Sequence, residues 1–158
     1  RFEPEKDLEV SVRFRFVSDK AKGFNVWFDD KGYKGSHAGH ICSVTINPTG
    51  VTMSDAKTGN FQNDIYEKKK SPEGLSAEQK AMLATKSSRV PVSLAQGDWH
   101  ALRIRTKGEE VEVQLDGKPV GSFTSVGIAH ESKTLVSLTT NLVDVHYDDF
   151  AVRGVAKP

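Results

Sequence analysis

A tryptophan set between an amide and a carboxylate is the feature of this sequence best suited to chemistry. Trp27 is two residues from both Asn25 and Asp29, so in a strand the three side chains point to the same face. An aromatic ring contacts the apolar face of a sugar, while planar polar groups bind its hydroxyls. The pattern predicts a sugar-binding surface centred on Trp27. The alternative is that Trp27 packs beneath the polar segment 55–90.

Two arginines are expected to extend this surface. Arg13 and Arg15 alternate with apolar residues, so both lie on the polar face of their strand. A guanidinium forms paired hydrogen bonds with hydroxyls or with acidic sugar groups. We expect their strand to neighbour that of Trp27, which would place them in the same site. The alternative is that they pair with Asp29 or Asp30.

Hydrolysis of a glycoside requires two carboxyl groups on either side of the bond that is cleaved, about 5–10 Å apart. Asp29 and Asp30 are the best candidates, because they follow Trp27 at a strand end. His40 is the candidate for assisting them. The sequence contains no G-x-S-x-G nucleophile motif and no glycine-rich phosphate loop. Catalysis is therefore a hypothesis that no recognisable motif supports.

Metal binding has less support in the sequence. His37 and His40 are three residues apart, but no third ligand accompanies them, so we predict no zinc site. The adjacent acids Asp148 and Asp149 are the one candidate for Ca²⁺, which needs about six converging oxygen ligands. The alternative is that these acids cap a loop or pair with an arginine. No other cofactor is expected.

Composition and charge narrow the class of protein. A chain of 158 residues with 37% hydrophobic residues has the size of one domain, and we expect a single domain over 1–158. Its 22 Lys and Arg residues nearly balance 21 Asp and Glu residues, which argues against a nucleic-acid partner. The single cysteine, Cys42, excludes an internal disulfide. No stretch approaches the ~20 apolar residues of a membrane span.

Alternation of apolar and polar residues is the dominant pattern, and it is typical of half-buried strands. Connections between the strands are too short for parallel crossovers, which predicts an all-β antiparallel sandwich or closed barrel. The expected strands are 8–16, 23–29, 39–46, 51–54, 99–106, 110–115, 120–123, 133–139 and 142–152.

The polar segment 55–90 interrupts this rhythm. It contains one predicted short helix, 77–85, because Ser76 and Gln79 have the spacing of a capping box. Long loops on a rigid β scaffold often carry function, so one interpretation is a lid or side wall of a binding site. The other is a surface excursion that packs against the rim of the sandwich.

Three stretches share a pattern of strand openings and a tight hairpin: GDWHALRIR (97–105), VEVQLDGKPVGSF (111–123) and VDVHYDDFAVR (143–153). Together they resemble the concanavalin A-like, or laminin-G-like, sandwich superfamily. Within it the chain is most similar to bacterial domains classed with the 3-keto-disaccharide (3-keto-glucoside) hydrolases. The resemblance implies a jelly-roll sandwich from an exported protein, periplasmic or extracellular. Trp99, which opens the first of these stretches, is expected to anchor the core.

The resemblance also implies two departures from the family. Its members begin with one or more strands before the position of Arg1, so we expect the chain to lack N-terminal strands of a larger domain. Acidic and amide side chains alternate on the family's second inner strand, and the matching positions are Ile41, Ser43 and Thr45. The family's acidic group is therefore absent at those positions.

The leading functional hypothesis is a carbohydrate-associated β-sandwich domain that binds glycan on one sheet face. One alternative is a glycoside hydrolase that acts on 3-keto sugars or related glycosides. Another is a non-catalytic scaffold or docking domain that contacts other domains of a larger exported protein.

Overall fold

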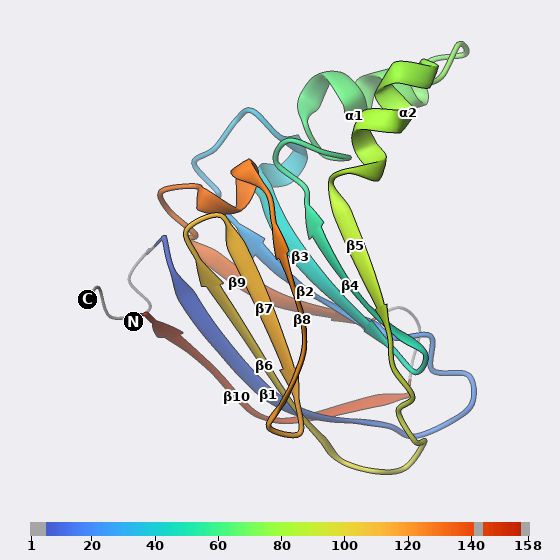
Figure 1. Ribbon diagram of the computed structural model, residues 1–158, viewed down its shortest axis with the longest axis vertical. Helices are drawn as coiled ribbons and strands as arrows, with labels where there is room; N and C mark the ends of the chain where they lie inside the picture. The colour runs from blue at the N-terminus through green and yellow to red at the C-terminus, as the bar shows by residue number, and fades with distance from the viewer. Residues whose placement is uncertain (1–5, 141–143, 156–158) are drawn as a thin grey trace.

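Two five-stranded antiparallel sheets stack face to face in the computed structural model, which describes residues 6–140 and 144–155 (Figure 1). The β1 sheet has the order β10-β1-β6-β7-β8 and comprises β1 (Leu8–Phe16), β6 (His100–Lys107), β7 (Glu110–Leu115), β8 (Lys118–Thr124) and β10 (Val145–Gly154). The β3 sheet has the order β5-β4-β3-β2-β9 and comprises β2 (Phe24–Asp29), β3 (His40–Asn47), β4 (Gly50–Asp55), β5 (Ser87–Pro91) and β9 (Leu135–Thr140). The predicted all-β sandwich is confirmed.

The core lies between the sheets, where the alternating apolar residues meet. On β2, Phe24, Val26 and Phe28 are fully buried, as the pattern predicts. Phe14 of β1 meets Phe24 edge-on, with 4.9 Å between ring centroids, so the two sheets interlock through aromatic rings. Burying each such ring stabilises the fold by roughly 1.5–3 kcal/mol.

A β-bulge in β3 decides which side chains share a face with Trp27. Phe28 pairs with Cys42, but Asp29 pairs with His40, so Ile41 is an extra residue in the ladder. Ile41 and Cys42 consequently both point into the core. Without the extra residue, His40 would face the core; with it, His40 lies beside Trp27.

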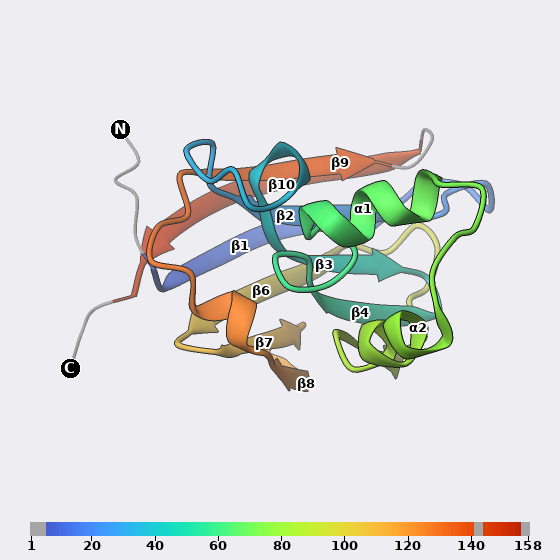
Figure 2. The same ribbon diagram turned by 90° about the horizontal axis from the view of Figure 1, so that it is seen from above.

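Two helices occur in the excursion, where the sequence predicted one. α2 (Ala77–Ala84) carries the predicted capping box between Ser76 and Gln79. α1 (Asn63–Lys70) buries only Ile65, so it has no apolar stripe from which to predict it. Both helices lie at one end of the β3 sheet (Figures 1 and 2). No helix within the described residues is long and apolar enough to cross a membrane.

Two predictions were wrong, one about the strand next to β2 and the other about the burial of Trp99. The strand of Arg13 and Arg15 does not adjoin β2, because β1 pairs with β6 and β10 in the opposite sheet. Trp99 does not anchor the core: it is 38% exposed. Both arginines stack over its ring on the outer surface, 5.2 and 5.0 Å from the ring centroid.

We expect the thiol of Cys42 to be unreactive in the folded protein. Burial raises the pKa of its thiol to about 12, so almost no thiolate is present at pH 8. We expect a disulfide reagent such as dithionitrobenzoate to modify Cys42 only as the protein unfolds, with a rate that rises steeply with urea. Fast modification of the native protein would show that this part of the core is open.

Candidate functional site

The outer face of the β3 sheet carries short hydroxyl side chains on both sides of Trp27. Residues directly opposite one another in an antiparallel ladder share a face, so each row across the sheet can be followed through the register. The row of Trp27 consists of Ser137, Trp27, Ser43, Ser54 and Ser87. The next row consists of Thr139, Asn25, Thr45, Thr52 and Arg89.

A cleft of about 150 Å³ lies between this face and the excursion. Its floor is formed by Trp27 with Ser43, Thr45, Ser54 and Ser87 of the adjoining strands. Asn60, Phe61, Leu83 and Lys86 of the excursion form its walls. Pockets for drug-sized ligands usually measure roughly 300–1,000 Å³, so this cleft suits a single ring.

Trp27 is partly buried by an aromatic cluster at one end of the cleft. The ring of Phe61 meets it edge-on at 5.3 Å, and the ring of His40 lies 4.3 Å away at an angle of 31°. The two sequence interpretations therefore both describe part of the structure. Trp27 packs against the excursion, and the same indole lines the cleft.

Asp29 holds His40 in place against Trp27. Its Oδ1 lies 2.7 Å from Nδ1 of His40, and its side chain is 8% exposed. Burial raises the pKa of Asp29, and the hydrogen bond to His40 offsets part of that rise. This pair positions the imidazole, and neither residue lines the cleft floor.

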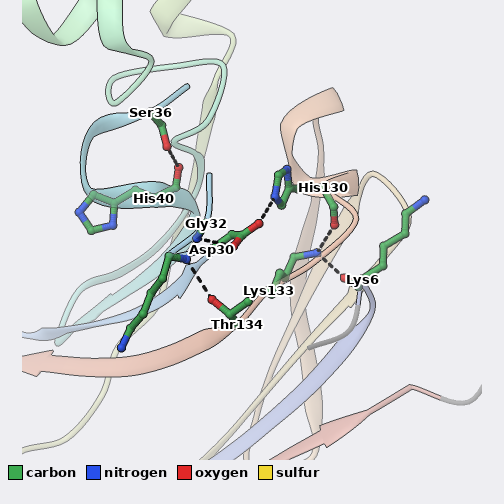
Figure 3. A network of polar contacts seen from close by, with 9 residues as sticks. Lys6, Asp30, Gly32, Ser36, His40, His130, Lys133 and Thr134 are labelled. Atoms are coloured by element: carbon green, nitrogen blue, oxygen red, sulfur yellow. Dashed lines mark hydrogen bonds and ion pairs between the residues drawn. The ribbon is translucent and has the colours of Figure 1, made fainter. Parts of the chain in front are cut away.

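Asp30 belongs to a separate network, shown in Figure 3. Its Oδ2 lies 2.8 Å from Nε2 of His130, and its Oδ1 accepts a hydrogen bond from the backbone of Gly32. The hydrogen bond from His130 lowers the pKa of Asp30. Asp29 and Asp30 thus bind different histidines and do not flank a shared space. Their catalytic roles, and that of His40, stay predictions that the geometry does not favour.

Asp55 is the one carboxylate among the described residues that line the cleft, and sequence reasoning missed it. It is 1% exposed. It accepts hydrogen bonds from the backbone and hydroxyl of Thr58, from the hydroxyl of Ser125 and from the backbone of Gly127. A Cβ at Gly127 would collide with the carboxylate. One of these hydrogen bonds goes to Oδ1 and three go to Oδ2, so Asp55 fastens the excursion to the 3-10 turn η2 (Val126–Ala129).

Asn25 and the arginines lie outside the cleft. The Asn25 amide accepts a hydrogen bond from Thr45 at 2.7 Å and donates one to Thr139 at 3.3 Å, so it orders the hydroxyl row beside the floor. Arg15 donates a hydrogen bond to Nδ1 of His146, and both residues belong to the β1 sheet, opposite the sheet of Trp27. Arg13 and Arg15 are therefore not brought together with Trp27.

Asp148 and Asp149, the candidates for a calcium site, match the alternative interpretation, in which they cap a loop or pair with an arginine. Asp148 accepts a hydrogen bond from the backbone of Asp149, and Asp149 lies 3.9 Å from the guanidinium of Arg13. Within residues 6–140 and 144–155, no group of three or more His, Cys, Asp or Glu side chains is placed to hold a metal ion.

The cleft residues that sequence reasoning missed come from two sources. Ser43 and Thr45 follow the period of two, but the pairing that sets them beside Trp27 and Asn25 is a register between two strands, which the pattern within one strand does not reveal. Phe61 and Lys86 belong to the excursion, which has no alternating pattern from which their position in the cleft could be predicted. The only signal for them was the interpretation of segment 55–90 as the side wall of a site.

Structural comparison places the chain among galectin-like sandwiches. A structure of sheep galectin-11 in complex with glycerol matches with a TM-score of 0.59 at 13% identity, over 93% of this chain and 90% of that one. Congerin II, liganded with lactose and MES, matches with a TM-score of 0.59 at 11% identity, over 92% and 90%. A double variant of human galectin-16 gives 0.57 at 14% identity, over 94% and 88%.

These likenesses define the fold, a galectin-like jelly roll, and at such low identity they define the fold alone. No protein-family model matches the sequence, and neither does any curated protein. The resemblance to the 3-keto-disaccharide hydrolases is wrong, because the structural matches are galectins and nothing points to that family. Export, a bacterial source and missing N-terminal strands stay predictions.

Proposed function

We propose that this protein is a carbohydrate-binding domain that holds one sugar ring in the cleft above Trp27. The observation that carries the proposal is an indole on the floor of a one-ring cleft, with serine and threonine hydroxyls beside it. The fold supports the proposal, since the similar congerin II structure contains lactose. The predicted site on one sheet face is retained, without its arginines.

The apolar and polar residues of the cleft suit different parts of a sugar. The indole of Trp27 offers a flat surface for the C–H groups of a sugar ring. Ser43, Ser54 and Ser87 can each donate and accept hydrogen bonds, which matches the dual character of sugar hydroxyls. Asp55 is buried and both of its oxygens accept hydrogen bonds from the protein, and it has no second carboxylate beside it in the described lining of the cleft, so the arrangement supports binding rather than cleavage.

A site of this size implies weak binding of a single sugar. At roughly 0.3 kcal/mol per non-hydrogen atom, a hexose of about 12 such atoms gains about 4 kcal/mol, which corresponds to a Kd near 1 mM. Longer glycans bind more tightly only if they also contact the rows of hydroxyls outside the cleft.

Titration of ¹⁵N-labelled protein with a panel of neutral and acidic oligosaccharides tests the proposal. We expect millimolar or tighter binding of at least one glycan, with the indole N–H resonance of Trp27 shifting and that of Trp99 unchanged. No shift at Trp27 with any glycan at millimolar concentration would overturn the proposed function.

A further inference from the structure

Two lysines without acidic partners border the cleft. Lys86 lines the wall itself. The ammonium of Lys69 donates to the side-chain oxygen of Asn60 at 3.3 Å and lies 5.6 Å from the ring centroid of Phe61, and both of these residues line the cleft. Among the residues that the structure describes, neither lysine forms an ion pair.

The acids nearby are already engaged or lie on the outside of the helices. Asp55 is buried and accepts four hydrogen bonds from the protein, and Asp29 is bonded to His40. Glu67 and Glu73 pair with Lys70 and Lys68. Asp64 and Glu78 are exposed in the first turns of α1 and α2.

The charge of the excursion therefore differs from that of the whole chain. Segment 55–90 contains seven Lys and Arg residues against five Asp and Glu residues, whereas the chain as a whole is nearly balanced. The other cation on this face, Arg89, donates to Thr49 at the β3–β4 turn and so leans away from the cleft. Among the described residues, Lys86 and Lys69 are the cations that border the cleft without an acidic partner, and their two positive charges outnumber the one carboxylate in its lining, the buried Asp55.

We propose that the cleft selects sugars that carry a negatively charged group, either the carboxylate of a uronic acid or a sulfate ester. Lys86 contacts the anion, and Lys69 adds attraction from the rim. The inference rests on the proposed function, because it names the class of sugar bound at the same site. A charge-assisted hydrogen bond in a partly enclosed cleft is about twice as strong as a neutral one, which separates acidic from neutral sugars.

Matched pairs of glycans test the inference by calorimetry. One pair is trigalacturonate and its methyl ester, and the other is a galactose disaccharide with and without a 6-sulfate. We expect the acidic member of at least one pair to bind roughly tenfold more tightly at low salt, with the advantage shrinking as salt screens the charges. The pair that shows it identifies the anion as carboxylate or sulfate.

Variants assign the effect to the cleft. Lys86→Gln should remove most of the difference between acidic and neutral members, and Lys69→Gln a smaller part. Lys80→Gln is the matched control, since it removes one positive charge from α2 at an exposed position outside the cleft.

The outcomes separate the two proposals. Equal affinity within both pairs overturns the selection for acidic sugars and leaves glycan binding standing. Equal losses in Lys86→Gln and Lys80→Gln overturn it too, because the attraction would then be general. Absence of binding by every probe removes the proposed function along with it.

Discussion

Replacing Trp27 with alanine should abolish measurable glycan binding while leaving the sandwich folded. The indole lies in the floor of the cleft, and its loss removes the flat surface on which a sugar ring can lie there. Aromatic residues at the centre of a binding site typically contribute 2 kcal/mol or more, which corresponds to about 30-fold or more in affinity. Calorimetric titration with the best-binding glycan measures the effect.

The second tryptophan provides the control. Trp99 is exposed on the opposite sheet, so Trp99→Ala should bind glycan with unchanged affinity. Thermal unfolding of both variants establishes that each is folded. Retention of full affinity by Trp27→Ala, or loss of affinity in Trp99→Ala, would place the binding site elsewhere.

Asp55→Ala should destabilise the protein by roughly 3–5 kcal/mol. The substitution leaves the hydroxyl of Ser125 and the backbone N–H groups of Thr58 and Gly127 without their acceptor, and each unsatisfied buried group costs about 1–3 kcal/mol. Urea unfolding followed by circular dichroism measures the loss. Affinity for glycan should fall as well, because the wall that contains Phe61 loses its attachment.

Asp64→Ala is the control for charge and helix content. Asp64 is exposed in the first turn of α1, and we expect a change of no more than about 1 kcal/mol. If both variants lose similar stability, the carboxylate of Asp55 does not fasten the excursion and the account of the wall is wrong.

Local periodicity predicted which face a side chain occupies, but not which strands become neighbours. Arg13 and Trp27 both lie on outer faces, as their alternation indicates, yet those faces belong to opposite sheets. Nothing in either strand encodes its partner, because pairing is settled by the packing of the whole sandwich. The same reason explains Trp99, whose position before β6 leaves it outside the core.

The hairpin was predictable because its chemistry is local. Asp116 and Gly117 have φ angles of 53° and 77°, the positive values that an Asp-Gly turn between two strands requires. Such motifs recur in unrelated sandwiches, so they led to the correct fold class and the wrong family. β5 was missed because Ser87–Pro91 has little of the apolar or β-branched character of a typical strand.

The serines in the row of Trp27 have no fixed hydrogen-bonding polarity. A serine hydroxyl can turn its proton toward or away from a ligand, so this row can accept axial and equatorial substituents alike. In the proposed site, discrimination among sugars then falls to segment 55–90, the insert that forms the walls of the cleft. Exchange of that one insert would alter what the molecule recognises, while the ten-stranded framework beneath it stays the same.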